Sequence, residues 1–351
     1  MGDVHTNGKT EHCNGSSKTN GTVMKNGFAG DAALRSSRPS LWFEEEIEED
    51  LRWVFSVSKI LHTGLSKFQN IALVDSGPFG KVLILDGKLQ SAEADEFVYH
   101  EALVHPALIH HSNPKNVFIM GGGEGSTARE TLRHKSVQNV VMCDIDKEVV
   151  DFCRAYLTSN REAFRSNRLD LIINDARAEL EKQKDTFDVI IGDLADPVEG
   201  GPCYQLYTQS FYEKIVKQRL NSGGIFVTQA GPAGILSHGE IYTSIYNTLR
   251  QVFKFVVPYA AHVPSFSDTW GWIMFLQASD QPLCKLSVEE TDSRLKQRLT
   301  GDLRFLDGET MTAIFGLNKT VRRTLAGETH VYTEETARYI HGHGSAQTLS
   351  R

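Results

Sequence analysis

The stretch VFIMGGGEGSTARE, from Val117 to Glu130, joins an apolar run, three consecutive glycines and a helix-forming run. VFIM has the composition of a buried strand, and STARE starts a helical pattern. Glycines between a strand and a helix let the backbone turn tightly and approach a ligand at the N-terminus of the helix. The stretch therefore predicts the first strand–loop–helix unit of a nucleoside-binding α/β domain.

This unit is repeated along the chain after a helix expected over residues 95–111. Strands are expected at 115–120, 139–146, 169–175, 187–193 and 223–231. Helices are expected after them at 126–134, 147–157, 176–183, 210–220 and 238–253. Alternating strands and helices with nearly continuous apolar strands predict a parallel sheet that is covered on both faces.

The alternation ends with two β-rich runs, at 254–264 and 270–279, that have no helix between them. A connection this short cannot cross over to a parallel strand, so the last strand is expected to be antiparallel. The predicted fold class is therefore α/β: a class I methyltransferase-like Rossmann fold, mostly parallel with its last strand antiparallel, plus a small N-terminal β-sheet domain.

The rest of the chain divides by composition. Residues 1–40 are rich in Gly, Ser, Asn, Thr and Lys, which predicts a disordered tail. Residues 41–94 hold short β-rich runs separated by turn residues, which predict a sheet of hairpins that packs on another subunit or on the next domain. Residues 95–280 form the expected catalytic domain, and 281–351 a helical extension and tail.

The overall composition narrows the function classes. The 351 residues are 40% hydrophobic and 23% charged, with a net charge of −7, which argues against a nucleic-acid partner. The five cysteines are scattered without metal-ligand spacing, and their odd number favours a reducing compartment. We expect no membrane span and no secretion signal, and hence a cytoplasmic protein.

Carboxylates follow the expected strands in turn. Glu124 lies in the glycine loop, Asp144 ends the second strand 21 residues after Gly123, and Asp175 ends the third. The fourth strand runs into GDLADP, with Asp193 and Asp196. Because parallel strands present their carboxyl ends at one edge of the sheet, these five carboxylates should gather there and repel one another. Such an edge suits a multiply cationic ligand.

The carboxylates also have individual interpretations, some of which need no ligand. The spacing of Asp144 is the one at which an acid meets ribose hydroxyls. Glu124 would repel a pyrophosphate and attract an ammonium or sulfonium group, or it supports the helix dipole. Asp175 accepts a hydrogen bond from an adenine amino group, with the N–H of Ala176 as a donor beside it, or it is a helix N-cap. GDLADP by itself is also an ordinary turn.

Eight motifs together resemble one family. They are FQNI, LILDGKLQ, DEFVYHE, GGGEGSTARE, CDID, ND followed by Ala, GDLADP and VTQAG, in this order between about residues 42 and 276. The chain resembles the aminopropyltransferases, that is, the spermidine and spermine synthases. Within that family, PVEGGPCYQLYT and VTQAGPAG are most similar to the thermospermine synthases of plants.

The resemblance implies the transfer of an aminopropyl group from decarboxylated S-adenosylmethionine to a polyamine, with 5′-methylthioadenosine as the leaving group. It makes Asp193 the catalytic residue that takes the proton of the attacking amine, and a carboxylate within hydrogen-bond reach can do this. The donor is a co-substrate, and neither a metal nor a resident cofactor is expected. The N-terminal sheet is similar to the family's oligomerisation domain, which implies a homodimer or homotetramer.

The resemblance also assigns the binding residues. The donor-binding positions are Gln69, Glu124, Asp144, Asp175, Ala176 and Pro202. The residues that line the polyamine channel are Tyr99, His100, Asp196, Gln229 and Phe266.

Three positions depart from the spermidine synthase pattern. Glu124 replaces an aspartate, Ala230–Gly231 replaces a pair that contains a glutamate, and Phe266 replaces a tyrosine. Losing an acid and a hydroxyl should disfavour a short diamine, so we expect spermidine as the acceptor. Only the resemblance favours thermospermine over spermine as the product.

Three alternatives stay open. The first is a spermine or spermidine synthase. The second is a methyltransferase that uses S-adenosylmethionine; Glu124 and Asp196 count against it, because the methionine carboxylate must be accommodated. The third is a non-catalytic polyamine-binding protein, and the intact Asp193 counts against it.

Overall fold

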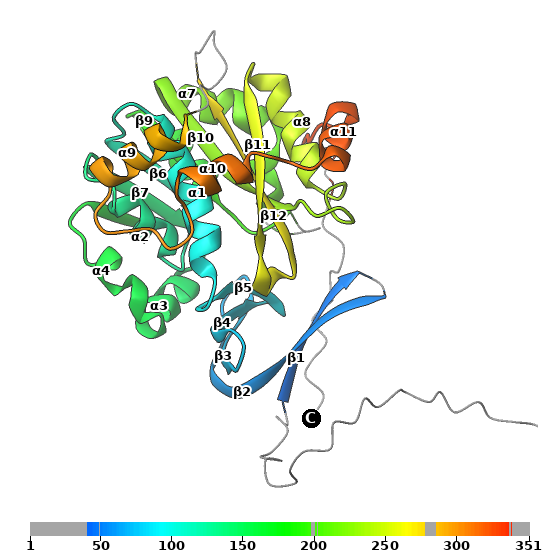
Figure 1. Cartoon of the computed structure of the whole chain (residues 1–351). Coiled ribbons are helices and arrows are strands. Elements are labelled where there is room, and N and C mark those ends of the chain that lie inside the picture. Colours follow the sequence, from blue (N-terminus) through cyan, green and yellow to red (C-terminus); the bar gives the residue numbers. More distant parts are fainter. Residues whose placement is uncertain are drawn as a thin grey trace, which may run out of the picture. The chain divides into compact units, whose positions relative to one another are not determined.

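The computed structural model describes residues 41–48, 50–197, 201, 203–277, 286–336 and 338. They form a five-stranded sheet and a seven-stranded sheet with helices around the larger one (Figure 1). The tail expected over residues 1–40 lies outside the described residues. In the described part of the chain, no helix combines the length and the apolar composition needed to cross a membrane.

The small sheet, sheet A, is an antiparallel meander in chain order. Its strands are β1 (Leu41–Glu48), β2 (Leu51–Leu65), β3 (Asn70–Ser76), β4 (Gly80–Leu85) and β5 (Lys88–Ala92). Alternate residues are buried on one face, where Phe55, Val74 and Val82 pack in a core of their own. The hairpin sheet predicted from the β-rich runs is therefore present, and it also includes the glutamate-rich β1, whose composition gave no strand signal.

The large sheet, sheet B, has the strand order β11-β12-β10-β9-β6-β7-β8. The strands are β6 (Asn116–Gly121), β7 (Asn139–Asp144), β8 (Leu169–Ile173), β9 (Phe187–Asp193), β10 (Leu220–Pro232), β11 (Val256–Val263) and β12 (Asp268–Leu276). β12 runs antiparallel to both β10 and β11, while the pairs from β10 to β8 are parallel. The predicted fold class, including the antiparallel last strand, is confirmed.

Helices lie on both faces of sheet B (Figure 1). They are α1 (Glu96–His110), α2 (Ser126–Leu132), α3 (Lys147–Tyr156), α4 (Arg161–Phe164), α5 (Ala176–Lys182), α6 (Gln209–Phe211), α7 (Lys217–Arg219), α8 (Tyr242–Val252), α9 (Val288–Arg298), α10 (Gly308–Ile314) and α11 (Lys319–Gly327). Short helical turns are η1 (Thr158–Asn160), η2 (Cys203–Tyr207), η3 (Tyr212–Val216) and η4 (Pro264–Phe266).

Two predicted helices differ from the observed ones. The helix expected over 210–220 consists of α6, the π-helical turn η3 and α7, and Leu220 already belongs to β10. The helix expected over 238–253 begins only at Tyr242. Both differences concern helix boundaries, which depend on packing more than on local pattern.

The topology places three strand ends side by side, because β6 lies between β7 and β9. Gly121 ends β6 with a φ of +75°, and a Cβ atom there would lie 2.2 Å from the carbonyl oxygen of Asp193. The N–H of Gly122 donates to this oxygen at 3.1 Å. Glycine is needed at this position because any side chain would separate the glycine loop from the end of β9.

Candidate active site

A cavity of about 830 Å³ lies between the carboxyl ends of the sheet B strands and the turns of sheet A. All described residues of the predicted site line it: Gln69, Tyr99, His100, Glu124, Asp144, Asp175, Ala176, Asp193, Asp196, Gln229 and Phe266. Pro202 lies outside the described residues. The structure thus brings the two predicted sets of residues, which span about 200 positions, into one space.

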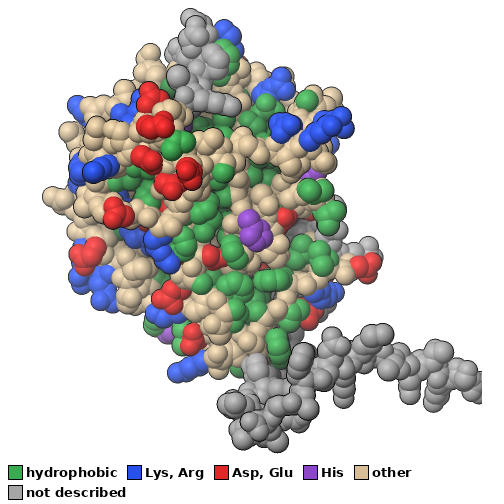
Figure 2. Space-filling model, in the orientation of Figure 1, with side chains coloured by type: hydrophobic (Ala, Val, Ile, Leu, Met, Phe, Trp, Pro, Cys, Tyr) green, Lys and Arg blue, Asp and Glu red, His purple; other side chains and the backbone are tan. Residues whose placement is uncertain are grey.

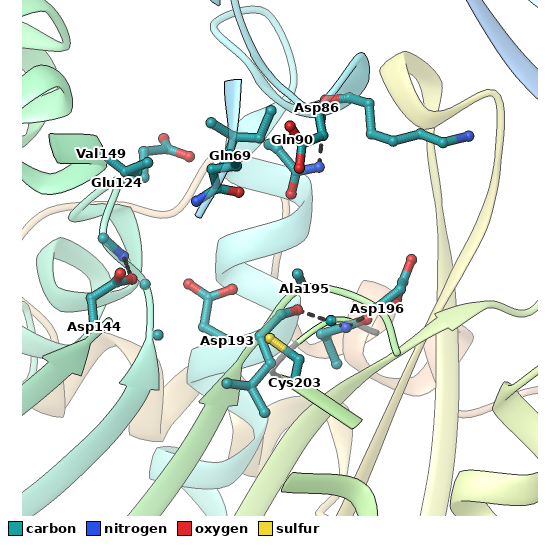
Figure 3. A pocket seen from close by; sticks show the side chains of 18 of the residues that line it. Gln69, Asp86, Gln90, Glu124, Asp144, Val149, Asp193, Ala195, Asp196 and Cys203 are labelled. Atoms are coloured by element: carbon teal, nitrogen blue, oxygen red, sulfur yellow. Dashed lines mark hydrogen bonds between the residues drawn. The ribbon is translucent and has the colours of Figure 1, made fainter. Parts of the chain in front are cut away.

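Asp193 occupies the centre of this cavity. Figure 3 shows its carboxyl group below Gln69, with Asp144 and Glu124 on one side and Asp196 on the other. The cavity therefore extends to two sides of Asp193: we call the side with Glu124 and Asp144 the donor arm and the side with Asp196 the acceptor arm, after the roles predicted for these residues from the sequence. A group that reacts with both a donor and an acceptor must lie where these two arms meet.

Two hydroxyl groups hold the carboxylate of Asp193. The hydroxyl of Tyr99, on α1, donates to Oδ1 at 2.9 Å, and that of Thr127, on α2, donates to Oδ2 at 2.6 Å. Burial, together with the charge of Asp193, raises the pKa of Tyr99 well above its usual value, so this phenol remains a donor. Sequence reasoning missed Thr127, because a threonine inside a helix carries no functional signal.

Asp144 is bound to the glycine loop as its spacing indicated. Its Oδ2 accepts the N–H of Gly123 at 2.9 Å, and its Oδ1 accepts the N–H of Asp146 at 2.8 Å. A Cβ atom on Gly123 would lie 2.7 Å from Oδ2. Burial raises the pKa of Asp144 to about 6, and the two N–H donors oppose this rise. Each oxygen keeps a lone pair for a ligand hydroxyl.

Gln69 joins sheet A to this side of the cavity. Its side-chain Nε2 donates to Oδ2 of Asp146 at 2.8 Å, and the hydroxyl of Ser66 donates to the same oxygen at 2.6 Å. The other oxygen of Asp146 caps α3 by accepting the N–H groups of Glu148 and Val149. The buried carboxylate of Asp146 therefore joins the turn between β2 and β3 of sheet A to the start of α3.

Glu124 is both a cavity residue and a neighbour of the first turn of α2. Its Oε1 accepts the hydroxyl of Ser126 at 2.6 Å, so it supports the helix start, which is the simpler interpretation of this residue. Its carboxylate also lines the cavity. Burial raises its pKa, and the nearby His100 opposes the rise. The two interpretations of Glu124 are thus compatible.

An ion-pair network holds His100 beside Glu124. Nδ1 of His100 lies 2.8 Å from Oε2 of Glu96, and Arg129 donates to both oxygens of Glu96 at 3.0 and 2.8 Å. Burial lowers the pKa of His100, but the hydrogen bond with Glu96 and the charges of Glu124, Glu96 and Asp193 outweigh burial and raise it to about 9. The imidazole is therefore protonated at neutral pH.

The same network is the closest approach to a metal-binding geometry in the described part of the chain. Ligand atoms of Glu96, His100 and Glu124 all lie within 4.8 Å of one another. However, Arg129 donates to both oxygens of Glu96, so this carboxylate is already paired with a guanidinium group. The donor set fits an ion-pair network better than a metal site.

Asp175 follows β8 and caps α5. Its Oδ1 accepts the N–H of Ala178 at 2.9 Å, which is the N-cap interpretation. The residue is exposed and lines the cavity together with the buried Ala176. One oxygen of Asp175 therefore serves the helix, while the residue's position still gives it access to a ligand.

Asp196 and Gln229 form the start of the acceptor arm. The Nε2 of Gln229 donates to Oδ1 of Asp196 at 3.0 Å, to the carbonyl of Leu194 at 2.7 Å and lies 2.8 Å from the hydroxyl of Tyr207. Its Oε1 accepts the N–H of Gly231 at 2.8 Å. Gln229 is 2% exposed, so this amide mainly orients its neighbours.

Burial changes the charge state of Asp196. It raises the pKa of this carboxyl group to about 7; the hydrogen bond from Gln229 opposes the rise, and the charge of Glu240 adds to it. Asp196 therefore changes charge near neutral pH, in the range where a polyamine is cationic.

Aromatic rings form one wall of the acceptor arm. Phe266 lies 4.7 Å from Trp270 and 5.8 Å from Tyr99 between ring centroids. Trp270 lines the cavity, whereas Trp272, two residues along β12, is fully buried. Such a wall offers apolar contact, which suits methylene groups, because the two donors among these rings already have protein partners: the hydroxyl of Tyr99 donates to Asp193 and Nε1 of Trp270 donates to Oε1 of Gln229 at 3.2 Å.

Comparison with known proteins identifies the family. Residues 96–287 match the family described as the spermine/spermidine synthase domain, and residues 41–93 match the one described as the spermidine synthase tetramerisation domain. The chain is 60% identical over 305 residues to the thermospermine synthase ACAULIS5 of Arabidopsis thaliana, covering 87% of this chain and 89% of that protein.

The chain belongs to the spermine/spermidine synthase family.

Two further similarities agree with this family. A polyamine aminopropyltransferase of Sulfurisphaera tokodaii is 41% identical over 282 residues, which cover 80% of this chain and 91% of that protein. A crystal structure of a spermidine synthase in complex with the transition-state analogue AdoDATO superposes with a TM-score of 0.75 at 28% identity, covering 84% of this chain and 97% of that one.

In this member of the spermine/spermidine synthase family, seven charged residues of the cavity had not been singled out in the sequence analysis, and the charges of three of them act on Asp196. These three are Glu45 on β1, Lys88 on β5 and Glu240 just before α8. Glu45 and Lys88 come from sheet A, from which the sequence analysis had assigned only Gln69 to a binding role. A polar residue on a short edge strand is typical of a position that faces solvent. The sequence therefore did not indicate that Glu45 and Lys88 line the cavity.

Proposed function

We propose that the protein transfers the aminopropyl group of decarboxylated S-adenosylmethionine to spermidine and produces thermospermine and 5′-methylthioadenosine. The observation that carries this proposal is the position of Asp193 between a donor arm and an acceptor arm that are both lined by carboxylates (Figure 3). The 60% identity to a thermospermine synthase supports the choice of product. Both substrates are cations, which suits this charge distribution.

In the donor arm, Asp144 accepts the ribose hydroxyls, and Asp175 with the N–H of Ala176 binds the adenine edge. Glu124 binds the ammonium of the aminopropyl group, and Gln69 borders the nucleoside from sheet A. We assign Pro202 to nucleoside binding from the sequence resemblance alone, because it lies outside the described residues. The described residues of this set all line the same cavity, which supports these roles. They are Gln69, Glu124, Asp144, Asp175 and Ala176.

The reaction is a displacement at carbon. The lone pair of a neutral amine attacks the aminopropyl carbon next to sulfur, the carbon–sulfur bond breaks, and its electrons neutralise the sulfonium. The nitrogen then carries an extra proton, which Asp193 accepts. Because the sulfonium is already an activated leaving group, the reaction needs neither a metal nor a resident cofactor. Alignment of the amine with the sulfonium supplies much of the rate.

Thr127 and Tyr99 orient Asp193 for this proton transfer. We expect Thr127→Val to lower kcat about tenfold, because the carboxylate loses a charge-assisted hydrogen bond, and to leave both KM values unchanged. Thr127→Ser should restore most of the rate, since serine keeps the hydroxyl and lacks only the methyl group. Steady-state kinetics of both variants measure this; a loss in Thr127→Ser as large as that in Thr127→Val would contradict the role of the hydroxyl.

In the acceptor arm, Asp196 pairs with an ammonium of the polyamine, and Tyr99, His100 and Phe266 line the channel. The side-chain amide of Gln229 already forms hydrogen bonds with protein groups, one of which is Asp196. Gln229 therefore affects polyamine binding through Asp196. Ala230 and Gly231 bring no carboxylate to this arm: both are buried, neither lines the cavity, and a Cβ atom on Gly231 would lie 2.3 Å from Cδ1 of Ile241.

The acceptor arm should respond to pH through Asp196. We expect Asp196→Asn to raise the KM for spermidine about tenfold at pH 8, where the wild-type carboxylate is charged. At pH 6 the two proteins should differ little, because the wild-type group, with a pKa of about 7, is then mostly protonated. The ratio of the two KM values cancels the ionisation of spermidine itself. A ratio that does not change with pH would contradict the charge role of Asp196.

The function is tested by identifying the product. The protein is incubated with decarboxylated S-adenosylmethionine and either putrescine or spermidine, and the products are separated by chromatography that resolves spermine from thermospermine. Thermospermine from spermidine is the expected result. Spermine, or spermidine from putrescine, would keep the reaction and overturn the assigned acceptor and product. No transfer to either amine would overturn the proposed function.

Sheet A also supports a homo-oligomer, as a dimer or tetramer. It carries exposed apolar side chains, among them Trp42 at 60% and Leu65 at 73% exposure, and Figure 2 shows apolar side chains grouped where Figure 1 places β2 to β5. We expect light scattering at micromolar concentration to give two or four times the chain mass, and a stable monomer would contradict this.

The unpaired thiols of Cys143, Cys153 and Cys203 support a reducing, cytoplasmic location.

A further inference from the structure

Asp268 brings a further carboxylate to the cavity from β12. Because β12 runs antiparallel to β10, it begins at the edge of sheet B where the parallel strands end. Asp268 is the first residue of β12 and lines the cavity. The residue before it, Ser267, has a φ of +58°, which is uncommon for a residue other than glycine. A strained turn therefore presents Asp268 to the cavity.

The carboxylate of Asp268 has only uncharged partners among the described residues. Its Oδ1 accepts the N–H of Thr269 at 2.7 Å, and its Oδ2 accepts the hydroxyl of Ser237. In the described part of the chain, no lysine, arginine or histidine forms an ion pair with it. The residue is half-buried, and each of its oxygens keeps a lone pair for a ligand. This carboxylate is therefore suited to bind an ammonium group.

Trp270 connects the surroundings of Asp196 to Asp268. The side-chain amide of Gln229 donates to Oδ1 of Asp196 at 3.0 Å and accepts Nε1–H of Trp270 at 3.2 Å. Trp270 and Asp268 are two residues apart on β12, so their side chains share one face and their Cα atoms lie about 7 Å apart. Since all three residues line one cavity, the acceptor arm continues from Asp196 along Trp270 to Asp268.

The other charged residues of the cavity that the sequence analysis did not single out have different surroundings. Glu45 lies 3.5 Å from the ammonium of Lys88, and Asp86 is exposed in the turn between β4 and β5 of sheet A. Glu240 precedes α8, and its charge adds to the rise in the pKa of Asp196. Asp268 differs from them because it belongs to the strand that carries Trp270 of the aromatic wall. The remaining two are Lys67, in the turn between β2 and β3, and Arg177, in the first turn of α5.

We propose that Asp268 binds the terminal ammonium of the triamine while Asp196 binds the central one, and that Asp268 is thereby a specificity-determining residue for the acceptor. This inference rests on the proposed function. With the attacking nitrogen at Asp193, three methylene groups lead to the central nitrogen. Four more, in contact with Trp270, lead to the terminal nitrogen. A diamine ends at Asp196 and gains nothing from Asp268, which favours spermidine over putrescine.

The test removes the terminal ammonium from the acceptor and the charge from the protein, separately and together. The specificity constant kcat/KM is measured for spermidine and for an N-butyl diaminopropane, which keeps the attacking nitrogen, the central nitrogen and the four-carbon chain. In the wild type this analogue should be about tenfold poorer than spermidine, because it leaves Asp268 without its cation. In Asp268→Asn, spermidine should become about tenfold poorer and the analogue should change little, so the two become similar.

Three further variants serve as controls. Asp268→Asn itself keeps both hydrogen bonds, because the hydroxyl of Ser237 can accept from the new amide. Ser237→Ala removes one of these bonds and keeps the charge, so it should keep the wild-type preference for spermidine over the analogue. Asp86→Asn and Glu240→Gln remove other carboxylates of the cavity and should keep it as well. Any effect of Glu240 through Asp196 cancels, because both acceptors carry the central nitrogen.

Each of three results would overturn the proposal. The first is a wild type that uses the analogue as well as spermidine, which needs no variant. The second is an unchanged preference in Asp268→Asn, since equal losses for both acceptors would mean that Asp268 only holds the turn. The third is a preference that disappears in Asp86→Asn or Glu240→Gln and persists in Asp268→Asn. A wild type that transfers nothing to any amine would instead refute the proposed function.

Discussion

Replacing Asp193 with asparagine should lower the rate of aminopropyl transfer about a thousandfold and leave the binding of 5′-methylthioadenosine unchanged. Asparagine has the shape of aspartate, but it cannot take a proton from the attacking amine. The neighbouring hydroxyl groups cannot replace it, because both already donate to this carboxylate and neither is a base. The loss should therefore appear in kcat and not in the affinity for the donor.

Single-turnover kinetics with saturating donor, together with calorimetry of methylthioadenosine binding, measure these two effects separately. Asp170→Asn is the matched control, since Asp170 is an exposed carboxylate of the same sheet, on β8, and does not line the cavity. A full rate in Asp193→Asn would refute the assigned role. A parallel loss of methylthioadenosine affinity would show that Asp193 shapes the pocket instead of accepting the proton.

Replacing Glu124 with glutamine should weaken the binding of decarboxylated S-adenosylmethionine about a hundredfold, because a carboxylate that pairs with an ammonium in a partly desolvated pocket contributes strongly to affinity. Methylthioadenosine lacks the aminopropyl ammonium, so its affinity should not change. Ordinary S-adenosylmethionine carries a carboxylate that Glu124 repels, so the variant should discriminate less between the two sulfonium compounds.

Competition binding of the three nucleosides to wild type and Glu124→Gln measures this pattern, and Glu148→Gln, an exposed position on α3, is the control. Because burial raises the pKa of Glu124, the wild type should also lose donor affinity as the pH falls and this group becomes protonated. Equal losses for all three nucleosides would indicate a distorted glycine loop rather than a lost ammonium contact.

The predicted acids came together because of a general property of parallel sheets. Glu124, Asp144, Asp175 and Asp193 each follow a strand, and the carboxyl ends of parallel strands meet at one edge. Their positions along the chain were therefore enough to place them in one cavity. The 21-residue interval between Gly123 and Asp144 is bridged by a direct hydrogen bond of 2.9 Å.

Other contacts in the site could not be predicted from the sequence. The bond between Thr127 and Asp193 spans 66 residues and depends on how α2 packs over the end of β9. Glu45 and Lys88 meet only because the two edges of sheet A approach each other, although 42 residues separate Glu46 from Lys88 in their hydrogen bond. The amide of Gln229 was assigned to the polyamine, but the fold surrounds it with protein partners.

The sequence by itself determined the α/β class, the antiparallel last strand, the hairpin sheet and the edge where the acids gather, because periodicity and strand-end chemistry are local properties. Only the tertiary structure decided which donors hold Asp193, which acids change charge near neutral pH, and which cation borders the acceptor arm. These depend on distances between elements and on burial, and both arise only when the elements pack together.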